Sequence, residues 1–332
     1  MRIKLAAAML AALSVVTPAT AQECNKPLKM LFSLPMTPMG RSNIMSVPVS
    51  LNGVDKQFVF DTGGMVLQMS PDVADELKLT RLESSVALYA TDGTVTRKYV
   101  VVEKFAMGKF APARIELQVS PNAGIEGIFT PMVFKTIDFD MDFAARKLNV
   151  ISGDHCDGKV IYWPAKAAAV VPITFSSNHI TVPVTVDGHD MIALVDTGAS
   201  TSTLRLDMAR RAFNLTPESP DMKNVGHVGT DENAAIYEYP FKTLSFGGVT
   251  VTNPRIRILT DVVSKNADKT LETGSSIKRI SDSLTLPQVI IGMDVLQKLH
   301  VYLALGEKKL YLTEASTPAG MAGATPAPAA GQ

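Results

Sequence analysis

The tripeptide Asp-Thr-Gly occurs twice in this chain of 332 residues, and each copy ends a run of apolar residues. The first copy closes the segment MSVPVSLNGVDKQFVFDTGG at residues 45–64, and the second closes ITVPVTVDGHDMIALVDTGA at residues 180–199. The segments align without a gap, so Asp61 and Asp196 hold equivalent positions 135 residues apart. Such a repeat predicts two similar structural units. It also places two like carboxyl groups in one molecule.

The repeat continues downstream of the two tripeptides. Residues 131–150 pair with residues 293–312 at an offset of 162, whereas the tripeptides are offset by 135. The second unit therefore carries about 27 additional residues. We assign them to the polar stretch 261–287, which has the character of a long surface loop.

The first 21 residues have the pattern of a secretory signal peptide. Arg2 and Lys4 precede an apolar stretch at residues 5–16, and Ala-Thr-Ala at 19–21 forms a small-residue cleavage site. The apolar stretch is too short to span a bilayer. Cys24 follows Gln and Glu instead of small apolar residues, so we expect no lipid anchor. The mature protein is expected to be periplasmic or secreted, with no membrane anchor.

The charge balance argues against polyanionic partners. The chain has 32 basic and 32 acidic residues, and removal of Arg2 and Lys4 with the signal peptide leaves 30 basic residues against 32 acidic ones. A net charge of about −2 favours neither nucleic acid nor an anionic membrane surface. With 46% hydrophobic residues, the chain can bury a core in each of two units.

Two cysteines remain after signal cleavage, Cys24 and Cys156. An oxidising compartment permits them to form a disulfide, which would tie the N-terminal segment to the region between the two units. The alternative is a pair of free thiols.

Three other chemistries find no support in the sequence. The histidines lack the short spacings of a zinc site, so neither a metal nor another cofactor is expected. The serines and threonines at 200–203 lack the G-x-S-x-G surroundings of a serine nucleophile, and no phosphate-binding loop motif is present. The five histidines are His155, His179, His189, His227 and His300.

Alternating apolar residues and β-branched residues dominate the chain and predict an all-β fold. Short helices are predicted at residues 71–79, 206–213 and 294–299. We expect two small barrel-like lobes at residues 28–152 and 168–313, a linker at 153–167 and a disordered tail at 314–332. The predicted strands include residues 46–51, 57–60, 95–105, 114–119, 181–186, 255–259 and 308–313.

Each unit resembles a retropepsin-like aspartic protease unit, of the kind found singly or fused in pairs. The resemblance rests on the apolar run into Asp-Thr-Gly, the short helix that follows, and the later run VIIGMDVL at residues 289–296. It covers nearly the whole mature chain. It implies two retropepsin-like β-barrel lobes related by a pseudo-two-fold axis, with peptides or proteins as substrates.

The resemblance also implies roles for residues of the two tripeptides. In this family the two aspartates meet at the axis and hold one water, a role that falls on Asp61 and Asp196. The hydroxyls of Thr62 and Thr197 would cross-link the two loops. The amides next to Gly63 and Gly198 would approach the carboxylates closely, which glycine permits.

Paired carboxylates have a chemistry of their own. Two carboxyl groups at hydrogen-bonding distance do not both ionise readily, so they share a proton with pKa values that belong to the pair. One carboxylate can then take a proton from water while the other group donates to the scissile carbonyl oxygen. The predicted activity is therefore that of an aspartic endopeptidase, which needs no cofactor.

The first unit departs from the family pattern at two positions. Gly64 stands where Ala or Ser is usual, and Thr130 stands where the second unit has Gly292. These departures leave open a non-catalytic protein that binds peptides with the same two lobes. A third alternative, in which lobes pair between chains, is disfavoured because the fused repeat supplies both aspartates. A monomer is expected.

Hairpins that follow the first helix of each unit are candidates for substrate-covering flaps. The first unit offers residues 88–96, with Tyr89 and Gly93, and the second offers residues 225–232, with Gly226 and Gly229. The alternative is that both are simple exposed hairpins.

Overall fold

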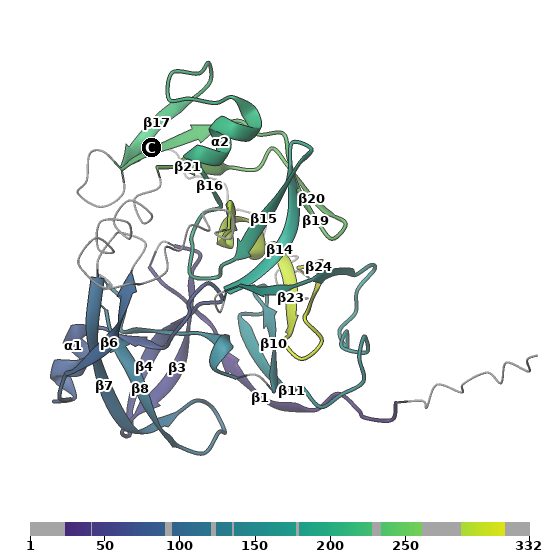
Figure 1. The fold of residues 1–332 in the computed structure, drawn as a ribbon. Helices are drawn as coiled ribbons and strands as arrows, with labels where there is room; N and C mark the ends of the chain where they lie inside the picture. Colours follow the sequence, from purple (N-terminus) through teal and green to yellow (C-terminus); the bar gives the residue numbers. More distant parts are fainter. Residues whose placement is uncertain are drawn as a thin grey trace, which may run out of the picture.

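The computed structural model describes residues 24–40, 42–89, 95–120, 124–134, 136–176, 179–227, 234–260 and 287–315 (Figure 1). The predicted signal peptide, residues 261–286 of the predicted loop, and residues 316–332 of the predicted tail lie outside the described residues. Glu314, which the sequence placed in the tail, is the last residue of the final strand.

Two matching hairpins begin the two lobes. In each, a strand of alternating apolar residues turns through two residues with positive φ: Asn52 and Gly53 at 52° and 89°, Asp187 and Gly188 at 44° and 81°. This backbone suits the tight turns that join twisted antiparallel strands. The first hairpin joins β3 (Met45–Leu51) to β4 (Val54–Phe60), and the second joins β14 (His179–Val186) to β15 (His189–Val195).

The N-terminal lobe closes into a six-stranded barrel. Its path runs β3–β4–β9–β5–β8–β7, and β7 pairs back with β3 through Ser50↔Ala106 and Leu51↔Phe105. The inward side chains of β3, Val47, Val49 and Leu51, are buried. The remaining elements of this half are β1 (Met30–Pro35), β2 (Thr37–Pro38), β5 (Gln68–Met69), α1 (Pro71–Glu76), β6 (Leu82–Tyr89), β7 (Val95–Ala106), β8 (Ala113–Val119), β9 (Gly127–Phe129), η1 (Pro131–Val133), β10 (Ile137–Asp142) and β11 (Lys147–Ser152).

The C-terminal lobe repeats this order with two interruptions. The counterpart of β7 is split into β18 and β19 around Pro240, and the counterpart of β8 is split into β20 and β21 around Pro254. Proline has no N–H to donate to a neighbouring strand, so a ladder breaks there. The elements are β12 (Ala169–Pro172), β13 (Thr174–Ser176), β16 (Thr203–Arg205), α2 (Leu206–Phe213), β17 (Lys223–His227), β18 (Ala235–Tyr239), β19 (Thr243–Phe246), β20 (Val249–Thr252), β21 (Ile256–Leu259), β22 (Val289–Ile291), α4 (Met293–Leu296), β23 (Leu299–Ala304) and β24 (Lys309–Glu314).

A third sheet joins the two lobes, with strand order β1–β11–β10–β23–β24–β12 (Figure 1). Each half contributes three strands, and β10 meets β23 at the centre in antiparallel register from Phe139↔Leu303 to Asp142↔His300. The predicted all-β fold of two related lobes is confirmed. This shared sheet was not predicted, because its central pairing joins strands about 160 residues apart, which no local pattern specifies.

Two predicted helices end earlier than expected. The helix predicted at 71–79 stops at Glu76, because Lys78 turns to φ 52° and the N–H of Leu79 bonds back to the carbonyl of Ala74. This left-handed ending satisfies carbonyls at the helix terminus. The helix predicted at 294–299 spans Met293–Leu296 instead, since Leu299 already pairs with Glu314 in the shared sheet. The helix predicted at 206–213 has those bounds.

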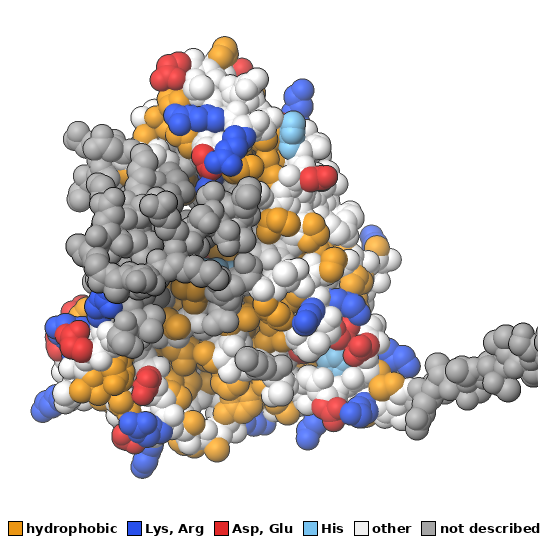
Figure 2. Space-filling view, viewed as in Figure 1, with side chains coloured by type: hydrophobic (Ala, Val, Ile, Leu, Met, Phe, Trp, Pro, Cys, Tyr) orange, Lys and Arg blue, Asp and Glu red, His pale blue; other side chains and the backbone are white. Residues whose placement is uncertain are grey.

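Among the residues that the structure describes, every helix is too short or too polar to cross a bilayer. Figure 2 shows Lys and Arg side chains interspersed with Asp and Glu over the described part of one face.

Candidate active site

The two Asp-Thr-Gly loops leave equivalent strands and are held in equivalent ways. Asp61 follows β4, and its N–H donates to the carbonyl of Phe129 in β9 at 2.9 Å. Asp196 follows β15, and its N–H donates to the carbonyl of Ile291 in β22 at 3.0 Å. In each lobe, the neighbouring strand, β9 or β22, thus fixes the position of the aspartate backbone.

The threonines lock the two loops together across the lobe interface. The N–H of Thr62 donates to Thr197 Oγ1 at 3.0 Å, and the N–H of Thr197 donates to Thr62 Oγ1 at 3.1 Å. Each hydroxyl then donates onward across the interface, from Thr62 to the carbonyl of Val195 at 2.7 Å and from Thr197 to that of Phe60 at 2.6 Å. Both threonines are buried, so the loops are held rigidly.

Backbone amides hold one oxygen of each carboxyl group. Asp61 Oδ1 accepts from the N–H groups of Gly63 at 2.8 Å and Gly64 at 2.9 Å. In the other lobe, Asp196 Oδ1 accepts from Gly198 at 2.8 Å and from Ala199 at 3.0 Å. These bonds orient both side chains and favour their ionised forms.

Gly63 and Gly198 also leave room for the carboxyl group of the opposite lobe. A Cβ at Gly63 would lie 2.5 Å from Asp196 Cγ, and one at Gly198 would lie 2.6 Å from Asp61 Cγ. Any other residue at either position would push the dyad apart. The two carboxyl groups thus approach each other at the junction of the lobes, and both residues keep part of their surface exposed.

Burial raises the pKa of both carboxyl groups. Burial raises the pKa of Asp61, although the bonds to Asp196, Gly63 and Gly64 and the charge of His179 lower it. Burial raises the pKa of Asp196 well above its usual value, and the charge of Asp61 raises it further. The two carboxyl groups therefore titrate as a pair, with pKa values that belong to both of them together.

The departure at Thr130 compensates for Pro131, which stands where the second unit has Met293 and has no N–H to donate. In the C-terminal lobe, the N–H of Met293 donates to the carbonyl of Ala199 at 2.8 Å. In the N-terminal lobe the hydroxyl of Thr130, which is fully buried, donates instead to the carbonyl of Gly64 at 2.7 Å. A side-chain donor has replaced a backbone donor under the same loop.

Close packing requires a glycine at Gly292, the counterpart of Thr130 in the C-terminal lobe. A Cβ at Gly292 would lie 2.6 Å from the backbone carbon of Thr201 and 2.9 Å from the carbonyl oxygen of Ala199. A Cβ at Gly64 would lie 3.1 Å from Asp61 Oδ2. Each lobe thus supports its aspartate loop by a different but complete arrangement.

Sequence reasoning missed three residues near the loops. Asp294 accepts from the N–H and the hydroxyl of Ser202 at 2.8 and 2.7 Å, which braces the loop after Asp196 against α4. The third residue, His179, donates from Nδ1 to the carbonyl of Gly63 at 2.9 Å. Asp294 lies within the VIIGMDVL run, so that motif could have indicated it. His179 has no signal in the sequence, since its partner lies 116 residues away.

The flap candidates are described only in part. Gly226 lies in β17, exposed and paired with Ile236 at a bulge, with φ 136° that suits glycine. Tyr89 ends β6, and its side chain lies outside what the structure describes. Gly93 and Gly229 fall outside the described residues. The flap role of these hairpins stays a prediction.

Cys24 and Cys156 are bonded to each other, with S–S 1.98 Å and Cα–Cα 5.7 Å. The N–H of Cys156 also donates to the carbonyl of Lys26 at 3.3 Å. The disulfide therefore fastens the N-terminal segment to the linker between the lobes.

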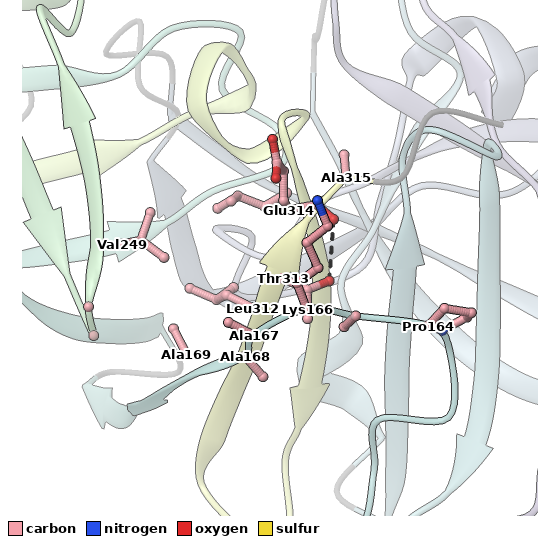
Figure 3. A pocket seen from close by; sticks show the side chains of 14 residues that line it. Pro164, Lys166, Ala167, Ala168, Ala169, Val249, Leu312, Thr313, Glu314 and Ala315 are labelled. Carbon is pink, nitrogen blue, oxygen red and sulfur yellow. Dashed lines mark hydrogen bonds between the residues drawn. The ribbon is translucent and has the colours of Figure 1, made fainter. Parts of the chain in front are cut away.

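A pocket of about 550 Å³ lies between the segment before β12, the β19–β20 turn and the strands β23 and β24 (Figure 3). It is lined largely by small residues, together with Lys166 and Glu314, and by none of the residues that surround the aspartates. Within the described ranges, no group of three or more His, Cys, Asp or Glu side chains is placed to hold a metal ion. The lining consists of residues 164–169, 247–249, 299 and 312–315.

Comparison with known proteins agrees with this arrangement. The family model described as aspartyl protease matches residues 47–130 and 182–295, which together make up more than half of the chain and include one Asp-Thr-Gly loop each. The chain belongs to the aspartyl protease family. Among solved structures it is similar to an aspartic proteinase from Irpex lacteus, with 14% identity and a TM-score of 0.48 over 87% of this chain and 98% of the other. No curated protein matches the chain.

Proposed function

We propose that this protein is an exported aspartic endopeptidase that hydrolyses peptide bonds with a water activated between Asp61 and Asp196. The observation that supports the proposal is the symmetric pair of loops, in which cross-linked threonines and close-packed glycines hold two carboxyl groups close together. Two such groups with unequal proton affinities are what general acid–base hydrolysis needs.

The reaction follows from the shared proton. The ionised carboxylate takes a proton from water as the water oxygen bonds to the peptide carbonyl carbon. The protonated carboxyl group donates to the carbonyl oxygen, which gives a neutral tetrahedral intermediate. Proton transfer to the amine nitrogen then allows the C–N bond to break. The rigid loops keep the two carboxyl groups in register through both steps.

The intact support of both loops favours an enzyme over a protein that merely binds peptides. A binding protein has no need of accurately held carboxyl groups. The Thr130 hydroxyl keeps a hydrogen bond to the Asp61 loop, which a loop that had lost its function would not need. Export is supported by the signal-like N-terminus and by the bonded cysteines, which suit an oxidising compartment. A monomer is supported because one chain supplies both aspartates and all strands of the joining sheet.

Incubation of the mature protein with a denatured protein mixture between about pH 3 and 8 tests the activity. We expect cleavage in the wild type, and a loss of about 10²- to 10⁴-fold or more in both Asp61→Asn and Asp196→Asn, because Asn cannot take or return the proton. Circular dichroism should show that both variants keep the fold. A wild type that cleaves nothing yet binds peptides would support the binding protein instead.

A further inference from the structure

His179 reaches from the C-terminal lobe to the loop that carries Asp61. It is the first residue of β14 and is half-buried, and its Nδ1 lies 2.9 Å from the carbonyl oxygen of Gly63. Because a carbonyl oxygen accepts hydrogen bonds and does not donate them, Nδ1 carries the hydrogen. The bond crosses the lobe interface and ends within two residues of the catalytic candidate.

One peptide group connects this bond to the carboxylate. The carbonyl of Gly63 and the N–H of Gly64 belong to the same peptide unit, and that N–H donates to Asp61 Oδ1 at 2.9 Å. A donor on the carbonyl oxygen polarises the peptide unit and strengthens the bond that its N–H makes. The imidazole therefore acts on the carboxylate through a short hydrogen-bonded chain.

Among the described residues, no side chain donates to the corresponding carbonyl of Gly198 in the other loop. Ile44 stands 135 residues before His179, at the equivalent position of the repeat, and its side chain has no hydrogen-bond donor. The equivalent peptide group joins Gly198 to Ala199, whose N–H donates to Asp196 Oδ1 at 3.0 Å. Within the described ranges, the loop of Asp61 alone thus receives a histidine donor from the opposite lobe.

The charge of the imidazole acts in the same direction. Burial lowers the pKa of His179, against the bond to Gly63 and the charge of Asp61, which raise it. Where His179 is protonated, its charge favours the ionised form of Asp61. Among the described residues, the titratable group that acts on His179 is Asp61, since the neighbouring strand β13 (Thr174–Ser176) has no ionisable side chain.

Building on the proposed function, we propose that His179 is a positioning residue that favours the ionised form of Asp61, so that Asp61 is the base and Asp196 is the acid. Asp61 takes the proton from water while Asp196 gives its proton to the carbonyl oxygen. As the C–N bond breaks, Asp61 gives its proton to the amine and Asp196 recovers one from a hydroxyl of the intermediate. Both carboxyl groups end as they began.

The pH profile of kcat/KM tests this role with three proteins. His179→Leu removes the donor, whereas His179→Asn can place its Nδ2 hydrogen near the position of Nδ1. We expect the acid limb of the profile to move to higher pH by about half a unit in His179→Leu, which lowers kcat/KM about threefold below that limb. His179→Asn should stay near the wild type. His189→Leu, which removes an exposed imidazole at the start of β15, should leave the profile unchanged.

A second measurement does not depend on cleavage. Titration of carboxyl ¹³C signals in Asp-labelled protein, with Asp61 assigned by its absence in Asp61→Asn, reports ionisation of the dyad directly. We expect the Asp61 signal to titrate at higher pH in His179→Leu than in the wild type. If His179→Leu does not fold, His179→Gln replaces it, because its longer side chain places the amide donor near the Nε2 position instead of the Nδ1 position.

The outcomes separate the two proposals. A wild type without peptidase activity would remove the proposed function, while the Asp61 titration would still test His179. Identical Asp61 titration in the wild type and His179→Leu would overturn the role of His179. So would equal shifts in His179→Leu and His179→Asn, because a donor retained near Nδ1 would then make no difference.

Discussion

At the scale of single residues, the two aspartate loops show how one structural requirement is met in two ways. In each loop one carbonyl, that of Gly64 or that of Ala199, needs a hydrogen-bond donor beneath it. Backbone supplies it in the C-terminal lobe from Met293, and a side chain supplies it in the N-terminal lobe from Thr130. A departure from a family motif is therefore weak evidence for lost activity until the partner of the changed residue is known.

The hydroxyl of Thr130 gives a direct prediction. Thr130→Val keeps the shape of the side chain but leaves the buried carbonyl of Gly64 without its donor, which should cost about 1 to 3 kcal/mol in the free energy of unfolding. Peptidase activity should fall as well, because the Asp61 loop loses its support. Urea unfolding and kcat/KM measure the two effects. Thr130→Ser, which keeps the hydroxyl, should retain most of both, and equal behaviour of the two variants would contradict this role.

At the scale of elements, the shared sheet carries two buried polar clusters. Asp138 in β10 accepts from His155 Nε2 at 2.6 Å, from the hydroxyl of Tyr302 at 3.1 Å and from the N–H of Leu305 at 3.0 Å.

Two positions along the same strand, Asp140 bonds to His300 of β23 and to side chains of the linker and β11. Its partners are His300 Nε2 at 2.5 Å, Asn149 Nδ2 at 2.9 Å and the hydroxyl of Tyr162. These clusters fasten the linker to the strands that join the lobes.

The cluster around Asp138 predicts a pH dependence of stability. Burial lowers the pKa of His155, but the bonds to Asp138 and the Cys156 carbonyl and the charges of Asp138 and Glu307 raise it above its usual value overall. A raised pKa in the folded state stabilises the fold below about pH 6.5, and this contribution is lost as the pH rises through the folded-state pKa. Loss of one partner of a buried pair typically costs about 3 to 5 kcal/mol.

His155→Gln should therefore unfold more easily than the wild type at pH 6, by about 3 to 5 kcal/mol, and the difference should shrink above about pH 6.5. Denaturant unfolding at several pH values measures it. His189→Gln, at an exposed histidine, should show little difference at any pH. A difference for His155→Gln that stays constant up to pH 9 would mean that its imidazole contributes packing and no charge.

At the scale of the whole molecule, the shared sheet joins the two lobes and the disulfide joins the N-terminal segment to the linker between them. The bond joins residues 132 positions apart and thus closes most of the N-terminal half into a loop. Cys24→Ser combined with Cys156→Ser should lower the free energy of unfolding by about 5 kcal/mol in the chain-entropy model. Unfolding of the wild type with and without a reductant measures the same effect. Two reactive thiols in protein from an oxidising compartment would contradict the pairing.

The sequence alone determined the features that depend on local pattern or on internal comparison. Alternation with period two specifies which residues form strands, and the gapless repeat singles out Asp61 and Asp196 with their threonines and glycines. Helix ends were less well predicted, because Lys78 and Leu299 adopt conformations that depend on the chain beyond them.

Tertiary structure alone decided which distant groups meet. The central β10–β23 pairing, the bond from His179 to Gly63 and the replacement of a backbone donor by Thr130 all join groups far apart in the chain. Neither the apolar pattern nor the repeat specifies such contacts, because each depends on the register in which two finished lobes pack. The repeat made the two aspartate loops alike in sequence, and packing of the lobes placed His179 against the loop of Asp61.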